Sequence, residues 1–157
     1  MEESIHYKFW TICMIQDQEE VLLLNRQHDH LKGYIPPGGK VEFPESFVDA
    51  AIREVKEETG LEVSNLVYKG LYEFVNLEKG DRYMIFNYIT KDYRGELLQN
   101  PPEGNPVWVN VEEAEQLPMQ ASTQISFPYF FEEGTFEIQI IWDNEKNQEG
   151  EVFIKRT

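Results

Sequence analysis

Three glutamates crowd the last turns of one predicted helix. In the stretch "REVKEETG", residues 53–60, Glu54 stands three and four positions before Glu57 and Glu58. Side chains at these spacings are neighbours on a helix surface, where like charges destabilise the helix by about 0.2–0.5 kcal/mol per pair. A hard cation such as Mg²⁺ would offset this repulsion, because it takes carboxylate oxygens, retains waters and bridges to phosphate. The cluster therefore indicates metal-assisted chemistry on a phosphorylated ligand, although a charge run more often forms a solvated helix surface.

The helix that presents these acids is predicted from about Ser46 to Thr59. Ser46 followed three residues later by Asp49 is typical of a capping box at a helix start. At about 100° per residue, Glu54 and Glu58 lie at the edge of the face that would pack on a core. That face is expected to hold Phe47, Val48, Ala51, Ile52, Val55 and Thr59.

Strand-like runs alternate with turns along the rest of the chain. Strands are predicted at residues 6–17, 20–27, 65–75, 81–90 and 135–143, with a short strand running into a short helix at 107–117 and a last helix at 122–134. Glycines and prolines predict irregular loops at His28–Gly39 and Arg94–Pro106. Helices interleaved with strands favour an α/β or α+β sandwich, of which we expect α+β, with a mixed central sheet flanked by helices.

The composition fits a single domain over residues 1–157. Its residues are 41% hydrophobic and 13% aromatic, which is enough for a packed core. The formal net charge is −15, from 29 acids and 14 bases, so the surface repels nucleic-acid polymers. A small nucleotide remains acceptable if a metal ion offsets the repulsion locally. No apolar run approaches the roughly 18 residues of a membrane helix, so no membrane partner is expected.

Two features bear on location. The stretch "MEESIHYKFW" is acidic and lacks the pattern of a signal peptide. Cys13 is the single cysteine, and it lies in an apolar strand-like run, so we expect a buried structural thiol. A cytoplasmic protein is therefore expected, and the oligomeric state stays open, with a homo-oligomer as one alternative.

The spacing around the acids resembles the Nudix box, G-x5-E-x7-R-E-U-x-E-E-x-G-U with U aliphatic. Gly39, Glu45 and the run from Arg53 to Leu61 occupy every fixed position. Such a frame of specified residues is rarely matched by chance. The resemblance to this family of MutT-like hydrolases implies its α/β/α sandwich. It also implies Mg²⁺-dependent hydrolysis, with Mn²⁺ as the alternative metal, of a nucleoside diphosphate linked to another group X.

The resemblance also implies roles within the box. The implied metal ligands are the carboxylates of Glu54, Glu57 and Glu58 and the carbonyl of Gly39. One of these acids or a nearby loop acid is expected to take the proton of the attacking water. Glu45 and Arg53 are expected to orient the metal-binding acids through hydrogen bonds. A surface ion pair is the alternative for Arg53.

Outside the box the candidates are weaker. Glu103, in the loop "NPPEGNP", is a candidate for the additional catalytic or metal-binding acid that some family members carry, with a surface glutamate as the alternative. Arg26 ends the second strand and is a candidate phosphate contact, with an exposed strand-end arginine as the alternative. His28 and His30 are expected to be solvated, because the acids already account for Mg²⁺.

The whole chain is similar to nucleoside triphosphate diphosphatases that act on oxidised purines such as 8-oxo-dGTP. The likeness rests on "LKGYIPPGGKVE", "GLYEFV", "WVNVEEAEQLPM" and "FPYF". It implies release of nucleoside monophosphate and pyrophosphate. The proline that marks ADP-ribose pyrophosphatases and the tyrosine that marks diadenosine polyphosphate hydrolases are missing. The coenzyme A signature is only partly echoed by "LLLNR".

The departures from that pattern concern the base. Relatives that select oxidised purines carry an Asp pair and a stacking Trp where this chain has "QASTQIS", and an Asn where it has Ile35. Ser122 and Thr123 keep hydrogen-bonding groups there, and Tyr34 could stack on a base; an ordinary core role is the alternative for each. Hydrolysis of another nucleoside-diphosphate-X compound is the runner-up. A non-catalytic nucleotide-sensing module is less favoured, because the box is intact.

Overall fold

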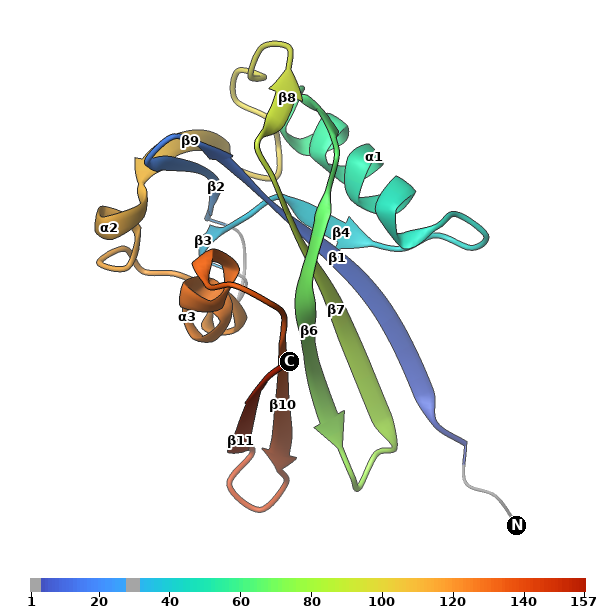
Figure 1. The fold of residues 1–157 in the computed structure, drawn as a ribbon. Helices are drawn as coiled ribbons and strands as arrows, with labels where there is room; N and C mark the ends of the chain where they lie inside the picture. The colour runs from blue at the N-terminus through green and yellow to red at the C-terminus, as the bar shows by residue number, and fades with distance from the viewer. Residues whose placement is uncertain (1–3, 28–31) are drawn as a thin grey trace.

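The computed structural model describes residues 4–27 and 32–157, which form an α+β sandwich around one mixed sheet (Figure 1). The strands are β1 (His6–Asp17), β2 (Glu20–Arg26), β3 (Gly33–Ile35), β4 (Gly38–Lys40), β5 (Glu62–Ser64), β6 (Val67–Asn76), β7 (Asp81–Thr90), β8 (Asp92–Arg94), β9 (Asn105–Asn110), β10 (Phe136–Asp143) and β11 (Gln148–Arg156). The helices are α1 (Phe47–Thr59), α2 (Val111–Ala114), α3 (Ala121–Ser126) and the 3-10 helix η1 (Phe127–Phe131). The predicted fold class is confirmed.

The main sheet mixes parallel and antiparallel pairs. Its order is β11-β10-β6-β7-β1-β2-β3, with β4 added on β1 and β9 added on β2. Strand β1 runs parallel to β7, and β10 runs parallel to β6. The remaining neighbours pair antiparallel, including β2 with β9. This last pairing matters for the site, because it joins residues that are 80 to 90 positions apart in the sequence.

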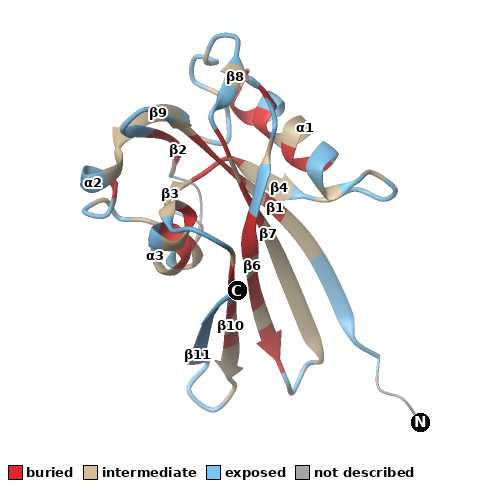
Figure 2. Ribbon diagram, viewed as in Figure 1, coloured by how far each residue is buried: buried red, intermediate tan, exposed pale blue. Residues whose placement is uncertain are grey.

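Strand β1 packs against both helical layers. Its successive side chains point to opposite faces of the sheet, as in any strand. Cys13 and Ile15 are buried in the cluster that contains Val55 of α1, whereas Met14 is buried in the cluster that contains Phe127 of η1. Figure 2 shows the buried residues running along the sheet and the inner sides of the helices. Burial raises the pKa of the Cys13 thiol to about 12, so the expectation of a buried structural thiol is confirmed.

Helix α1 begins and ends as its sequence predicts. The Ser46 hydroxyl accepts a hydrogen bond from the Asp49 backbone N–H at 3.0 Å, so Ser46 is the N-cap. Gly60 caps the other end with φ of 87°, a left-handed conformation that glycine adopts readily. The predicted core face is wrong at Val48, which is 39% exposed. Ala50 is fully buried instead, because the sheet packs against a slightly rotated stripe.

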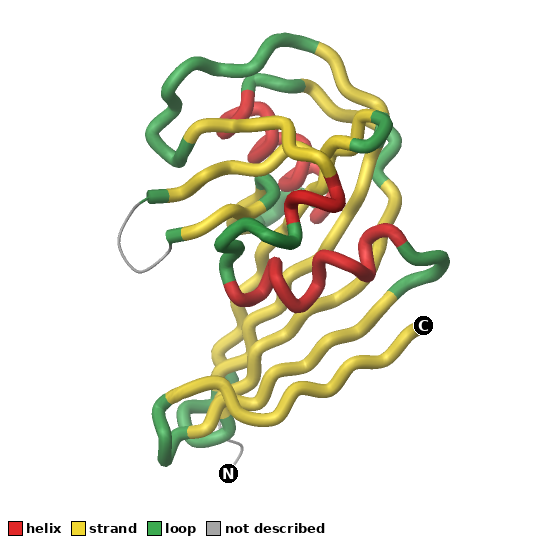
Figure 3. Tube along the Cα trace, turned by 90° about the vertical axis from the view of Figure 1, so that its left-hand side faces the viewer, coloured by secondary structure: helices red, strands yellow, loops and turns green. Residues whose placement is uncertain are grey.

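The structure corrects several predicted elements (Figure 3). The described part of the predicted loop 28–39 contains β3 and β4, and both ends of the predicted loop 94–106 lie in strands, β8 and β9. The predicted helix 122–134 is a short α-helix followed by a 3-10 turn. Strands β5, β8 and β11 were not expected. Three-residue strands are too short to show a period, and β11 is exposed on both faces, so it has no buried apolar alternation.

Two sequence predictions concern the histidines of the loop and the absence of a membrane helix. His28 and His30 lie outside the described residues. In the ranges 4–27 and 32–157, none of the helices has the length and apolar character needed to cross a bilayer.

Candidate active site

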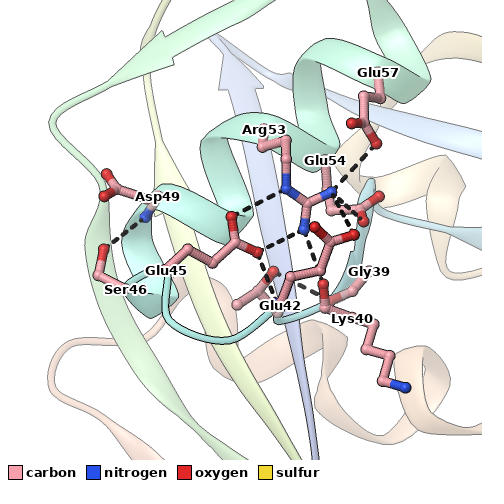
Figure 4. Close-up of polar contacts among 10 residues, drawn as sticks. Gly39, Lys40, Glu42, Glu45, Ser46, Asp49, Arg53, Glu54 and Glu57 are labelled. Carbon is pink, nitrogen blue, oxygen red and sulfur yellow. Dashed lines mark hydrogen bonds and ion pairs between the residues drawn. The ribbon is translucent and has the colours of Figure 1, made fainter.

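Arg53 donates five hydrogen bonds from one guanidinium group (Figure 4). Its Nε and Nη2 bond the two carboxylate oxygens of Glu45 at 3.0 and 2.6 Å. Its Nη1 bonds Glu54 Oε1 at 2.9 Å and Glu57 Oε2 at 3.3 Å. Nη2 also reaches the Lys40 carbonyl oxygen at 3.0 Å. A planar fork fixes several acceptors at once, so one side chain sets the positions of three acids.

Glu45 anchors this network from the loop before α1. Hydrogen bonds from Arg53 lower the pKa of Glu45 to about 2, and the Glu42 backbone N–H, 2.8 Å from Glu45 Oε1, contributes further. A carboxyl group with this pKa stays charged at neutral pH. Glu45 and Arg53 therefore form a permanent ion pair, with side chains that are only 20% and 24% exposed.

Two glycines bring backbone into contact with the acids and with β1. A Cβ atom added at Gly39 would lie 2.3 Å from the carboxyl carbon of Glu54. A Cβ atom added at Gly38 would lie 2.1 Å from the carbonyl oxygen of Thr11, in the strand that pairs with β4. Both separations are shorter than real Cβ contacts, so a side chain at either position would force its neighbour to shift. The sequence "GG" therefore allows a close approach of β4 to the acidic end of α1.

Glu58 is the buried acid of the cluster, with 6% of the residue exposed. The Gly38 backbone N–H donates to Glu58 Oε1 at 2.9 Å. Burial raises the pKa of Glu58 to about 8, and the charges of Glu54 and Glu103 act in the same direction, against the Gly38 hydrogen bond and the charge of Arg26. Glu58 therefore holds its proton at neutral pH until a positive charge approaches it.

The pairing of β2 with β9 places Glu103 beside Arg26. Asn105 at the start of β9 stands opposite Asn25, so the loop before β9 folds against the end of β2. Arg26 Nη2 lies 3.4 Å from Glu103 Oε2. The Arg26 Nε atom is buried and finds no hydrogen-bond acceptor within the described part of the chain. Because both charges act on the pKa of Glu58, this pair borders the acid cluster.

The three candidate base contacts lie on the other face of the sheet from α1. Tyr34 packs against the core cluster that contains η1, and its backbone hydrogen-bonds to the segment just before α3. Ser122 and Thr123 lie on α3 and line a narrow crevice together with Pro36. They are not part of the acid cluster. Pro36 is two residues before Gly38, so the chain passes directly from this crevice to the acids.

The donor set at the end of α1 fits a hard divalent cation. In residues 4–27 and 32–157, no three metal-binding side chains converge on one point. In this arrangement Arg53 hydrogen-bonds Glu54 and Glu57. Burial nevertheless raises the pKa of Glu54, and the charge of Glu57 raises it further, so Arg53 does not neutralise the acids fully. Glu57 is 59% exposed and has room to turn. Carboxylates beside a backbone carbonyl are the oxygen ligands that Mg²⁺ prefers.

Sequence reasoning missed two backbone groups and one acid of this site. The groups are the Gly38 N–H and the Lys40 carbonyl oxygen, and the acid is Glu42, whose Oε1 lies 3.9 Å from Arg53 Nη1. Backbone groups leave no residue-type signal, and only the doubled glycine hints at a close approach. Glu42 is one of 29 acids and stands at no fixed position of the motif.

Gly38→Ala is expected to lower stability, whereas Gly39→Ala is expected to lower metal affinity. Alanine at position 38 meets the backbone of Thr11, so the free energy of unfolding should fall by about 1–3 kcal/mol. Alanine at position 39 meets the movable end of Glu54, so stability should stay near parental while affinity for Mn²⁺ falls about tenfold. Chemical denaturation and Mn²⁺ titration measure the two effects. Equal loss of stability in both variants would contradict the contacts described for these glycines.

Comparison with known proteins agrees with this geometry. A family model described as NUDIX domain matches residues 6–130, a range that includes every candidate site residue. The uncharacterised Nudix hydrolase YvcI of Bacillus subtilis (strain 168) is 35% identical over 113 residues, which cover 69% of this chain and 70% of YvcI. YtkD of the same strain carries 8-oxo-dGTP diphosphatase as a provisional description. It is 46% identical over 70 residues, 45% of this chain and 41% of YtkD.

A solved structure matches nearly the whole chain. The crystal structure of the MutT protein from Bacillus halodurans superposes with a TM-score of 0.82 at 27% sequence identity. The match covers 94% of this chain and 97% of that one. It therefore extends over the sheet, α1 and the helices on the opposite face.

Proposed function

Because this chain belongs to the Nudix hydrolase family, whose members act on phosphoric anhydrides, we propose that it hydrolyses a nucleoside triphosphate to nucleoside monophosphate and pyrophosphate with the help of Mg²⁺. The observation that carries the proposal is the network in which Arg53 holds Glu45, Glu54 and Glu57 beside Gly39. Attack on a phosphorus atom needs gathered and oriented acids of this kind.

The metal ligands in this proposal come from α1 and β4. They are the carboxylates of Glu54, Glu57 and Glu58 and the carbonyl of Gly39. When bound, Mg²⁺, or Mn²⁺ in its place, offsets the charge of the phosphates, polarises their oxygens and favours loss of a proton from the attacking water. Glu45 accepts hydrogen bonds from Nε and Nη2 of Arg53, and this fixes the direction in which Nη1 points toward Glu54 and Glu57.

Groups around Glu58 would handle the phosphates and the proton. The buried Nε of Arg26 lacks an acceptor among the described residues, and a phosphate oxygen would supply one. Arg26 is therefore our candidate phosphate contact. Glu103 is our candidate base outside α1, because it is 49% exposed and its ion pair with Arg26, at 3.4 Å, is long. A phosphate that binds Arg26 would release this carboxylate toward the water.

We place the base on the opposite face of the sheet, at the mouth of the crevice beside α3. The crevice itself has a volume of only about 10 Å³, so a purine can enter it only if α3 shifts. Ser122 and Thr123 on α3 can donate and accept hydrogen bonds there, and Tyr34 lies in the adjoining core cluster. The segment from Pro36 to Gly39 would then lie along the nucleotide, between its base and its phosphates. The likeness to YtkD, which is described as an 8-oxo-dGTP diphosphatase, supports an oxidised or ordinary purine nucleotide. The missing acid pair favours weak base selection, which keeps another nucleoside-diphosphate-X compound as the second candidate.

A nucleotide panel tests this assignment. We expect Mg²⁺-dependent turnover of dGTP and 8-oxo-dGTP in preference to ADP-ribose and diadenosine tetraphosphate, and no turnover in EDTA. The ratio of kcat/KM for 8-oxo-dGTP over dGTP should stay below about 10³, equal to about 4 kcal/mol, because the described residues that line the crevice include no acid. A larger ratio would show that other residues read this edge. Preference for ADP-ribose would replace the triphosphate assignment. Tight nucleotide binding without any turnover would indicate a sensing module.

Glu103→Ala is expected to lower kcat by about tenfold to hundredfold while KM changes little. The reason is that a base acts on the transition state rather than on substrate binding. Glu96→Ala is the matched control, because Glu96 is an exposed acid in the same long loop. Steady-state kinetics with dGTP compare the two. If both variants match the parent within a few fold, Glu103 is an ordinary surface acid.

A further inference from the structure

The C-terminal strand β11 leaves one edge of the sheet open (Figures 1 and 2). It pairs with β10 on one side, and no strand of the described chain pairs with its other side. All of its residues are exposed. An open edge presents a row of backbone N–H and C=O groups that can pair with another chain. This edge has no proline, which is one of the usual means of preventing such pairing.

Three consecutive apolar side chains lie on this edge. Val152, Phe153 and Ile154 are 43%, 44% and 43% exposed. Val152 and Ile154 stand opposite Ile140 and Ile138 of β10, which are fully buried in the core. The apolar row of the core thus continues from β10 into β11 and ends there in solvent. A further strand beside β11 would extend this row and shield its last members.

We propose that β11 pairs antiparallel with β11 of a second copy, so that a two-fold axis joins the two sheets into one. The strand is self-complementary about Phe153. With Phe153 opposite its counterpart, Val152 faces Ile154 and Glu151 faces Lys155, and each of these pairs occurs twice by symmetry. Apolar residues then meet apolar residues, and acids meet bases.

A bulge in the hairpin favours this register. The pairing of β10 with β11 shifts between Ile140 and Trp142, which stand opposite Val152 and Glu149. A bulge twists the strand and interrupts flat pairing. With Phe153 at the centre, the apolar pairs lie beyond the bulge, and Glu151 lies within it, next to Val152. A register centred on Val152 would draw its ion pairs from Glu149, on the far side of the bulge.

The charge distribution favours β11 as the place where a second copy binds. The chain carries a net charge of −15, so two copies repel each other over most of their surfaces. The strand itself is neutral, because Glu149 and Glu151 balance Lys155 and Arg156. Its acids precede the apolar residues and its bases follow them. Antiparallel pairing therefore brings opposite charges together at both ends, which a strand with a single sign of charge could not do.

Sedimentation equilibrium of the full chain at about 0.15 M salt tests the proposal. The parent should associate reversibly from its 18.5 kDa monomer to a dimer of twice that mass. Glu151→Lys and Lys155→Glu each place like charges opposite one another at two positions, so each should raise the dimer Kd at least about tenfold. Glu145→Lys and Lys146→Glu make the same charge changes in the turn between the strands. These two controls should stay within about twofold of the parent.

Two rescue experiments fix the register. The double variant Glu151→Lys with Lys155→Glu restores opposite charges and should dimerise like the parent. An equal mixture of the two single variants should form a heterodimer with a Kd below that of either variant alone. A parent that stays monomeric at several hundred µM would overturn the proposal. So would a dimer that is indifferent to the single changes, or a mixture that associates no better than its components. Circular dichroism and unaltered dGTP turnover verify that each variant is folded.

Discussion

Glu58→Gln is expected to lower kcat by about 10³-fold, equal to about 4 kcal/mol, and Glu57→Gln by a similar factor. Each change removes one charged oxygen donor from the set that would hold the metal and leaves the shape of the side chain nearly unaltered. A glutamine amide oxygen at position 58 can still accept the hydrogen bond from the Gly38 N–H. The loss should therefore fall on chemistry and metal affinity rather than on folding.

Asp49→Asn supplies the matched control for these variants. It removes the same charge from the same helix, but Asp49 lies exposed in the first turn of α1, away from the acid cluster. Its kcat should stay within about twofold of the parent. Thermal unfolding of the metal-free Glu58→Gln variant should show no loss of stability, because the amide replaces a buried carboxyl group whose pKa is raised to about 8 and which carries little charge at pH 7. The metal-free Glu57→Gln variant loses only the charge on one long, exposed contact with Arg53, at 3.3 Å, so its stability should stay close to parental. Near-normal Mg²⁺-dependent turnover in both variants would reject this cluster as the active site.

Arg53→Lys is expected to cost about 10²-fold in kcat although the charge is kept. Lysine offers a compact ammonium group, which cannot span Glu45, Glu54 and Glu57 as the guanidinium does. Losing a group that orients metal ligands typically weakens metal binding by about 10–100-fold. Mn²⁺ titration should therefore show weaker binding in parallel with the lower kcat, and excess Mn²⁺ should restore part of the activity.

Arg94→Lys is the control for this substitution. Arg94 Nε bonds Glu62 at 2.7 Å, but the arginine side chain is 84% exposed and bonds no acid of the cluster. An exposed pair of this kind contributes little, so activity and metal affinity should match the parent. If Arg53→Lys behaved in the same way, Arg53 would be an ordinary surface ion pair and the orienting role would be wrong.

The acid cluster could be predicted from sequence because its information is local. Glu54, Glu57 and Glu58 share one helix, so the helical period alone brings them together. The cap at Ser46 and the glycine at position 60 fix the ends of that helix. The contact of Glu45 with Arg53 is also local, since the two residues are eight positions apart.

The rest of the site depends on pairings that one sequence does not specify. Glu103 meets Arg26 only through the register of β2 with β9. The role of Gly38 rests on its backbone N–H, which any residue but proline would carry. The sheet also separates Ser122 and Thr123 from the acids, and this separation follows from the layer order rather than from any motif.

Strand β11 could not be predicted from sequence for a different reason. The rule that finds strands looks for one buried face, and β11 has none, because it is the last strand of the sheet. Its run of three apolar residues between acids and bases can be interpreted only once the structure shows Val152 and Ile154 opposite the buried Ile140 and Ile138. The exposure of both faces of β11 prevented its prediction from sequence, and the same exposure leaves its edge open for the dimer proposed above.

Turnover of dGTP in ¹⁸O-labelled water with Mg²⁺, followed by mass analysis of the products, tests the central claim most directly. The account predicts deoxyguanosine monophosphate and intact pyrophosphate in equal amounts, with one ¹⁸O atom in one of the two products. It also predicts no orthophosphate and no reaction in EDTA. Orthophosphate as a primary product would contradict the diphosphatase assignment, and unlabelled products or turnover without a divalent metal would contradict metal-assisted attack by water at the acids of α1.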